Sequence, residues 1–268
     1  MGAQINSEIK NEMLPFIESN FRKISQREIA RRLNIGKTTI NRWSKELGLF
    51  YIKHTSNEEF FDELNNDSAY VLGYIFTDGN VSWNTKKSYW SLTITSSEKD
   101  KNHLENIRKL LSSTKPLLYS PKTKSYRLIA TNKKLCQKLM KLGVTPNKSL
   151  TINFPNIPKE QLRHFIRDVI DGDGSVDYVN REKSPHFEIR IYSGSENFLK
   201  RLSKVLNKEI CISTKIKKVH KNTFMLRYTC ARGKILANWI YNCTELYLDR
   251  KFNQYLNMKK MEVVVPDK

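Results

Sequence analysis

The chain contains two segments in which apolar and polar positions follow the same order. Residues 70–81 (YVLGYIFTDGNV) and residues 165–176 (FIRDVIDGDGSV) are apolar helical runs that end in Asp-Gly and pass directly into a strand-like segment. Apolar and polar side chains then alternate in residues 88–97 (SYWSLTITSS) and 186–195 (HFEIRIYSGS). Alternation with a period of two is typical of a strand with one buried and one polar face. The pattern therefore predicts an internal repeat.

Each copy continues in the same way. A helical stretch follows (residues 100–111 and 196–206), then two strand-like segments rich in Lys and Arg, and then a further helix. The order α-β-β-α-β-β-α thus occurs twice, which predicts an α+β fold with antiparallel sheets. Two sheets that each have one basic, polar face would form a saddle wide enough for duplex nucleic acid.

The N-terminal segment has a different pattern, two short helical runs separated by a break at residues 34–36. A helix-turn-helix needs one small residue and five apolar residues at set positions, and those positions hold Ala30 and Ile29, Leu33, Ile35, Ile40 and Trp43. Asn34 occupies the turn position where glycine is usual, and asparagine is the next most tolerant residue of a left-handed conformation. We therefore predict a small all-α helix-turn-helix domain at residues 1–54, followed by a polar linker at residues 55–67.

The second helix of this unit would present Lys37, Thr38, Asn41 and Arg42 outward. These side chains suit base edges and phosphates in a major groove. The alternative is an ordinary helical hairpin with a solvated polar face. The spacing favours DNA binding, in a role accessory to another site.

The charge of the chain strengthens the case for a polyanionic partner. The 268 residues include 47 Lys+Arg against 27 Asp+Glu, a net charge of +20. Residues 1–60 hold 10 basic and 7 acidic residues, residues 61–164 hold 17 and 8, and residues 165–268 hold 20 and 12. The excess therefore falls mainly on the two copies of the repeat. Phosphate neutralisation favours a nucleic-acid binder; a soluble surface that is merely lysine-rich is the alternative.

Other features exclude whole classes of protein. The 39% of hydrophobic residues can form a core, which excludes a disordered basic tail. No apolar run approaches the roughly 18 residues of a membrane span, and the N-terminus lacks a signal-peptide core. We expect a soluble, intracellular protein without membrane partners, in a bacterial or phage-host cytoplasm or an organelle. The four cysteines lack metal or disulfide spacing, and no phosphate-binding G-x-x-x-x-G-K-[ST] loop occurs.

The two motifs, VLGYIFTDG at residues 71–79 and IRDVIDGDG at residues 166–174, resemble the LAGLIDADG homing endonuclease family in its two-motif, single-chain form. The approach to the second motif (LGVTPNKSLTINFPNIPKEQLRHF) and the later segment LYLDRK extend the resemblance over about residues 68–258. The resemblance implies a monomer with internal pseudo-twofold symmetry, whose half-domains at residues 68–155 and 156–268 form a DNA-binding saddle.

The resemblance also implies the chemistry. The motif helices would pack together and bring Asp78 and Asp173 side by side, where the carbonyls of Thr77 and Gly172 would help them to hold two or three Mg²⁺ ions, which Mn²⁺ could replace. An aspartate at a helix C-terminus is disfavoured by the macrodipole, and a cation would offset that cost. The alternative is that Asp-Gly merely turns the chain; two matched occurrences favour the metal site.

The second motif departs from the family pattern. Asp168 stands where the family usually has glycine, so we expect it either to pair with a neighbour such as Thr77 or to mark a shifted helix interface; Gly73 would lie at that interface. Asp171 stands where the first motif has Phe76. The halves are therefore not equivalent, which leaves unequal cleavage of the two strands, or nicking, open.

Further candidates follow from the repeat. The family often carries a lysine after the fourth strand, and Lys133 and Lys234 are the candidates, with a solvated charge or phosphate contact as the alternative role. Side chains expected to contact DNA from the sheets and their turns are Trp83, Thr93, Thr95, Lys122, Lys124, Arg127, Arg190, Tyr192, Lys215, Lys217 and Arg227.

We therefore expect a Mg²⁺-dependent, sequence-specific, homing-type endonuclease that makes a double-strand break in long duplex DNA. The alternative is a non-cleaving binder on the same fold, either a transcriptional regulator or a maturase that binds intron RNA.

Overall fold

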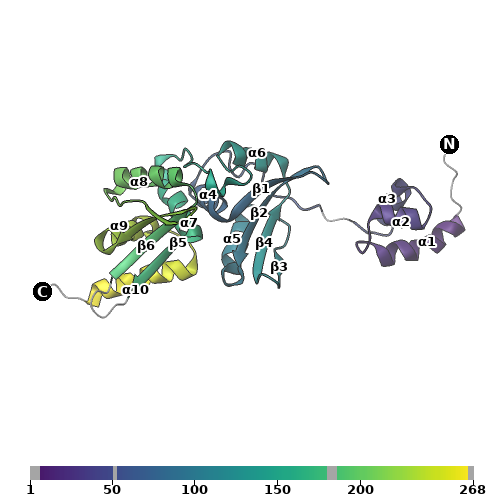
Figure 1. The fold of residues 1–268 in the computed structure, drawn as a ribbon. Coiled ribbons are helices and arrows are strands. Elements are labelled where there is room, and N and C mark those ends of the chain that lie inside the picture. Colours follow the sequence, from purple (N-terminus) through teal and green to yellow (C-terminus); the bar gives the residue numbers. More distant parts are fainter. Residues whose placement is uncertain (1–6, 51–52, 180–185, 265–268) are drawn as a thin grey trace. The chain divides into compact units, whose positions relative to one another are not determined.

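The structure, a computed structural model, describes residues 7–50, 53–179 and 186–264. The chain forms two compact units, Met1–Lys53 and His54–Lys268 (Figure 1). The expectation of a polar linker at residues 55–67 is not met. Thr55 and Asn57 hydrogen-bond with Thr114 and Leu111 of the larger unit, and Phe61 is buried in its core. Most residues of this segment are polar, but Phe61 anchors it to the larger unit.

The smaller unit is built from helices α1 (Ser7–Asn20), α2 (Gln26–Arg32) and α3 (Lys37–Glu46). Ser25 caps α2 by accepting a hydrogen bond from the backbone N–H of Glu28. Asn34, in the turn between α2 and α3, has a φ of 51° and so adopts the left-handed conformation that its position requires. The six residues of the expected spacing all pack in or against one small core: Ile29, Ala30, Leu33, Ile35, Ile40 and Trp43.

The larger unit contains the predicted repeat. The first copy comprises α4 (Asn66–Asp78), β1 (Gly79–Asn84), β2 (Tyr89–Ser97), α5 (Lys101–Leu110), β3 (Leu118–Ser120), β4 (Ser125–Ala130) and α6 (Lys133–Lys141). The second comprises α7 (Leu162–Asp173), β5 (Gly174–Val179), β6 (His186–Ser193), α8 (Glu196–Ile210), β7 (Lys217–His220), β8 (Thr223–Thr229) and α9 (Cys230–Tyr241). Helix α10 (Asp249–Val264) follows.

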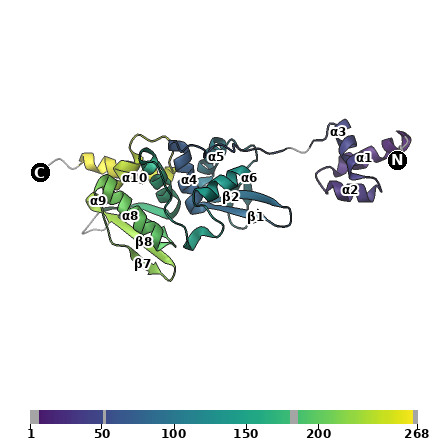
Figure 2. The same ribbon diagram turned by 90° about the horizontal axis from the view of Figure 1, so that it is seen from above.

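Each copy forms a four-stranded antiparallel sheet, in the order β1-β2-β4-β3 and β5-β6-β8-β7. The predicted α+β repeat is confirmed. Helices α5 and α6 pack on one face of the first sheet, and α8 and α9 pack on one face of the second (Figure 2). The alternating strands turn their apolar residues toward these helices, which leaves the polar residues on the opposite face of each sheet.

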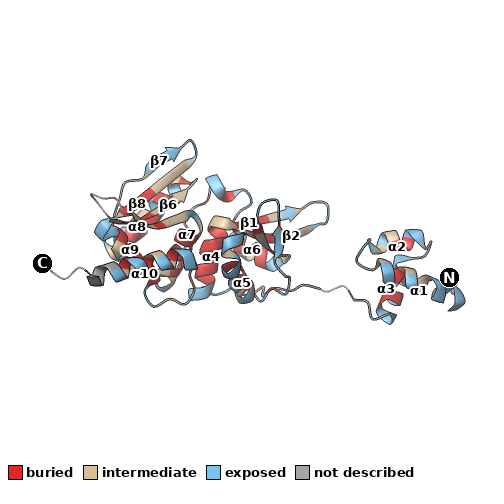
Figure 3. Cartoon of the chain, turned by 90° about the horizontal axis from the view of Figure 1, so that it is seen from below, coloured by how far each residue is buried: buried red, intermediate tan, exposed pale blue. Residues whose placement is uncertain are grey.

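Helices α4 and α7 pack against each other between the two sheets, and buried residues occupy much of both (Figure 3). Gly73 permits this close packing, because a Cβ atom there would lie 2.5 Å from the backbone oxygen of Phe165. At the other end of the contact, a Cβ on Gly172 would lie 2.1 Å from Oγ1 of Thr77. One hydrophobic core therefore runs through both copies.

None of the helices in the described ranges is long and apolar enough to cross a membrane.

The glycine contact can be tested by Gly73→Ala. The added methyl group would meet the backbone of α7, which cannot move away as a flexible side chain could. We expect the free energy of unfolding of the larger unit to fall by about 1–3 kcal/mol. Urea denaturation measures this, with the exposed α8 variant Asn197→Ala as the control. Equal stability of Gly73→Ala and wild type would contradict the close helix contact.

Candidate active site between the motif helices

Asp78 and Asp173 are the last residues of α4 and α7, and the helix contact brings them together. A Cβ on Gly172 would lie 2.9 Å from Oδ2 of Asp78, so the end of α7 directly adjoins the Asp78 carboxylate. Each helix stops at a glycine whose Cβ would collide with the helix's own last turn, 2.7 Å from the oxygen of Ile75 for Gly79. Asp-Gly therefore both ends the helix and leaves an acid at its tip.

The two carboxylates have elevated pKa values. Asp78 is half-buried and Asp173 is exposed at the rim of a hollow, yet surrounding protein still desolvates both. Desolvation, reinforced by the charge of Asp173, raises the pKa of Asp78 to about 6. Desolvation also raises the pKa of Asp173. Two like charges in a desolvated site favour a cation that neutralises them.

The hollow has a volume of about 240 Å³. Asp173 and Thr77 line it together with residues that sequence reasoning did not single out, notably Lys148, Ser193 and Asn222. Lys148 is 6% exposed. Burial lowers its pKa, whereas the charges of Asp173 and Asp78 oppose that change. Lys148 is therefore a buried cation beside both motif acids.

Lys251 is the second buried cation of the site. Its Nζ donates hydrogen bonds to the backbone oxygens of Ile170, Asp171 and Gly174, each at 2.6 Å. These carbonyls belong to the end of α7 and the start of β5, where a positive charge also complements the helix dipole. Burial lowers the pKa of Lys251 to about 8. Lys251 thus caps the helix that carries Asp173.

Lys133 and Lys234 have a weaker claim to the site. Lys133 is the exposed first residue of α6, and Lys234 is half-buried within α9. The sheet registers make Leu128 and Leu226 equivalent. Leu128 pairs with Ile94, which pairs with Gly79, and Leu226 pairs with Ile191, which pairs with Gly174. Counting onward from these leucines matches Lys133 with Ala231. The expected equivalence of Lys133 and Lys234 is therefore not supported.

Asp168 lies at the helix crossing, as expected from its place in the motif, with its Cβ against Gly73. It is fully buried, and neither carboxylate oxygen has a hydrogen-bond partner among the described residues. Thr77, the partner considered from sequence, donates instead to the backbone oxygen of Tyr74 at 3.1 Å. Burial, with the charges of Asp171 and Asp78, raises the pKa of Asp168 well above its usual range. The buried position of Asp168 therefore favours its neutral form.

Asp171 has a structural role that its place in the motif did not reveal. It is 1% exposed and accepts hydrogen bonds from the hydroxyls of Tyr70 (2.8 Å) and Tyr241 (2.7 Å) and from the backbone N–H of Leu248 (3.0 Å). Buried Arg167, one helical turn earlier, donates to the backbone oxygen of Leu246 at 2.8 Å. Together they attach residues 246–248, within the LYLDRK segment, to α7.

The donor set at the motif acids fits hard divalent cations. Mg²⁺ and Ca²⁺ prefer carboxylate, carbonyl and water oxygens. Thr77 and Gly172 lie in the last turns of their helices, where backbone carbonyls have no intrahelical donor. The described residues form no group of three or more Asp, Glu, His or Cys that could hold a metal alone. Substrate phosphate and water would therefore have to complete the coordination.

The candidate DNA-contacting residues fall on both faces of the sheets. Thr95 pairs with Arg127 and Arg190 pairs with Arg227 on the polar faces, which also carry Thr93, Tyr192 and Lys217. Lys122 and Lys124 are exposed in the turn before β4, and Lys215 is exposed in the irregular segment before β7. Trp83 lies two residues after buried Val81 and so on the same, helix-covered face of the sheet. The centroid of its ring is 5.5 Å from that of Trp90. Trp83 thus lies on the face opposite the other strand candidates, and its contact with DNA stays a prediction.

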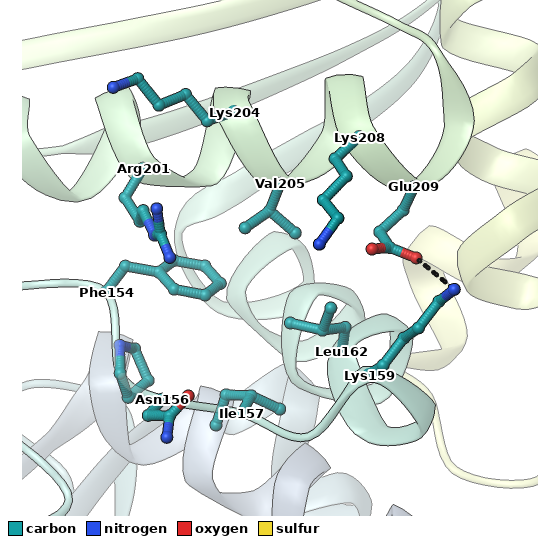
Figure 4. A pocket seen from close by; sticks show the side chains of 11 residues that line it. Phe154, Asn156, Ile157, Lys159, Leu162, Arg201, Lys204, Val205, Lys208 and Glu209 are labelled. Atoms are coloured by element: carbon teal, nitrogen blue, oxygen red, sulfur yellow. Dashed lines mark ion pairs between the residues drawn. The ribbon is translucent and has the colours of Figure 1, made fainter.

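A separate basic groove lies between residues 154–162 and α8, with Lys159, Arg201, Lys204 and Lys208 along it (Figure 4). Lys159 forms an ion pair with Glu209 at 3.8 Å. The groove shares no lining residue with the hollow at the motif acids. It lies along a helix that covers the apolar face of the second sheet, away from the polar face.

The role of Asp171 predicts a large stability loss on Asp171→Ala. The substitution leaves two buried tyrosine hydroxyls and the backbone N–H of Leu248 without their acceptor, and it removes a counter-charge of Arg167. We expect the free energy of unfolding to fall by about 3–5 kcal/mol. Urea denaturation measures this free energy. The control is Asp177→Ala, at a half-buried residue of β5. A loss no greater than that of the control would contradict this role.

Comparison with known proteins identifies the domain and the fold. Residues 160–239, which contain the second motif, match the sequence profile of the LAGLIDADG-like domain. The search of curated proteins gave no significant match.

Solved structures extend the likeness to the larger unit. The LAGLIDADG meganuclease I-AabMI, bound to uncleaved DNA, superposes with a TM-score of 0.54 at 11% identity, over 75% of this chain and 92% of that one. The LAGLIDADG homing endonuclease I-GzeII, in complex with its DNA target, gives 0.51 at 14% identity over 75% and 92%. I-SmaMI, bound to an uncleaved DNA target with calcium ions, gives 0.50 at 13% identity over 76% and 95%. The chain thus carries a LAGLIDADG-like domain, and its larger unit has the fold of the LAGLIDADG homing endonucleases.

Proposed function

We propose that the chain is a homing-type DNA endonuclease that makes a metal-dependent double-strand break at a specific site in a long duplex. The observation that carries this proposal is the pair Asp78 and Asp173, held together at the ends of α4 and α7 between two sheets with polar outer faces. A non-cleaving binder would have no need of two adjacent desolvated acids. The DNA in the three similar complexes belongs to those proteins, and its extension to this chain is part of the proposal.

Each residue of the site has a distinct proposed task. Asp78 and Asp173, with the carbonyl oxygens of Thr77 and Gly172, would hold the divalent ions. When bound, such ions stabilise charge on a phosphate and lower the pKa of water. Lys148 would place its positive charge on the scissile phosphate, because it lines the same hollow as Asp173. Lys251 would keep the end of α7, and so Asp173, in position.

Both DNA strands would be cut in this proposal. Asp171, which raised the alternative of nicking, accepts hydrogen bonds from Tyr70, Tyr241 and Leu248 and has a structural role. Asp168 contacts Gly73 inside the helix crossing, where burial favours its neutral form. The departures of the second motif therefore leave one acid for each strand.

The experiment that tests this function is cleavage of a randomised duplex library in Mg²⁺, followed by assay of the recovered sites in supercoiled plasmids. We expect linear product, and at least about 100-fold slower cleavage by Asp78→Asn or Asp173→Asn. Asp67→Asn, at the exposed second residue of α4, is the matched control and should retain wild-type rates. Unchanged rates in both motif variants would refute the nuclease assignment, and accumulation of nicked circles alone would refute the double-strand break.

We further propose that the N-terminal unit is a helix-turn-helix that adds a DNA contact. Lys37, Thr38, Asn41 and Arg42 are exposed on α3. Asn41 accepts a hydrogen bond from Gln26 of α2 at 2.7 Å, which orients its amide before DNA binds. The conformation of Asn34 and the packed core of this unit support the assignment.

Lys37→Ala tests this accessory role. Lys37 begins α3, where a cation near the exposed backbone N–H groups suits a phosphate contact. We expect weaker binding to all duplexes and a salt dependence reduced by about one counterion. Fluorescence anisotropy at several salt concentrations measures both. Lys23→Ala, in the exposed turn before α2, is the control; identical salt slopes for the two variants would contradict the proposal.

A further inference from the structure

Glu188 is a buried acid on a sheet face that also carries Arg190, Arg227 and Lys217. It lies on β6, opposite Asp177 of β5 and Thr229 of β8. Its strand parity is that of Arg190, whereas its neighbours Phe187 and Ile189 belong to the core. Glu188 therefore belongs to the sheet face turned away from α8 and α9, the face that the proposed function gives to DNA.

The Glu188 carboxylate holds two arginines at once. Nη2 of Arg190 donates to Oε1, and Arg227 donates to Oε2 through Nε at 2.7 Å and Nη2 at 2.5 Å. Arg190 and Arg227 are direct partners in the β6–β8 register. The Glu188 side chain is 0% exposed, whereas those of Arg190 and Arg227 are 34% and 36% exposed. The acid is thus covered by the two cations that it binds.

This arrangement leaves some N–H donors of both arginines available for hydrogen bonds to DNA. Two cations directly opposite each other on neighbouring strands repel, and the shared carboxylate offsets that repulsion. Arg227 uses Nε and one Nη2 hydrogen on Glu188, so Nη1 and the second Nη2 hydrogen still form a paired donor edge. Arg190 uses Nη2 and retains Nε and Nη1 as donors to other groups. Two donors at this spacing match O6 and N7 of guanine.

The first sheet has no such pair at the same place. The registers make Ser91, Thr93 and Ile129 the counterparts of Glu188, Arg190 and Arg227. A serine, a threonine and an isoleucine cannot present a guanidinium fork. The asymmetry between the two copies therefore lies on the DNA-facing surface as well as in the motifs.

We propose that Glu188 is a positioning residue that holds Arg190 and Arg227 as a rigid pair, and that this pair reads guanines at neighbouring positions in the half of the target beneath β5–β8. Glu188 is too deeply buried to touch a base itself. By ordering two long side chains before DNA arrives, it reduces the entropy lost on binding and restricts the directions in which they can donate. The inference rests on the proposed function and names a feature of its substrate.

The test is selection of bound duplexes from a randomised library by the full-length protein in Ca²⁺, sequenced for wild type and variants. Wild type should prefer guanine at two neighbouring positions in one half-site by at least about fivefold over other bases. Glu188→Gln should lower that preference below about twofold, because the arginines lose their shared anion, while the other positions of the site keep theirs. Ser91→Ala, the counterpart in the first copy, should leave the guanine positions unchanged.

Glu188→Gln leaves two cations beside a neutral amide, which could prevent folding. A second variant therefore tests the same proposal independently. Arg227→Lys keeps the charge and lacks the fork, and it should lose guanine preference at one of the two positions while retaining affinity within about threefold. A wild type that enriches and cleaves a site without those guanines would overturn this inference alone. Guanine preference that persists in both variants would do the same. A wild type that enriches no sequence would overturn the proposed function as well.

Discussion

The close packing of α4 against α7 is the contact on which the rest of the larger unit depends. Gly73 brings one helix against the backbone of the other, and Gly172 repeats the approach beside Thr77. Because Asp78 and Asp173 end these helices, the separation of the two acids is set by rigid packing, without any contribution from loop conformation. The same contact joins the two copies into one core and sets how their sheets are placed about the acids.

The second copy supports its acid differently from the first. Asp171 reaches across to Tyr70 of α4 and on to Tyr241 of α9, so a single carboxylate connects the two motif helices with the chain that follows. Phe76, its counterpart, instead packs edge-on against Phe165. Equivalent positions of the two motifs therefore hold an aromatic contact in one copy and a buried polar network in the other. This network accounts for Asp171, whereas Asp168 has no hydrogen-bond partner among the described residues.

Local patterns were sufficient to predict the repeated topology, the motif acids and the turn at Asn34. Period-two alternation and Asp-Gly at a helix end depend on neighbours in sequence, and these features survive in the fold. The same rule, counted from Val81, puts Trp83 on the face opposite the other strand candidates. Lys148 and Lys251 were missed because their role depends on contacts with a helix distant in sequence. Glu188 was missed because a charged residue within an alternating strand looks solvent-exposed until its partners on β8 are known.

The three carbonyls at the end of α7 and the start of β5 are bound by a lysine that is synthesised after them. Their donor lies on α10, after both copies of the repeat are complete. During synthesis on the ribosome, α4, α7 and both sheets emerge while the end of α7 still lacks this cap. A nascent chain therefore contains Asp78 and Asp173 well before it contains Lys251. The end of α7 remains without this cap until α10 has been synthesised.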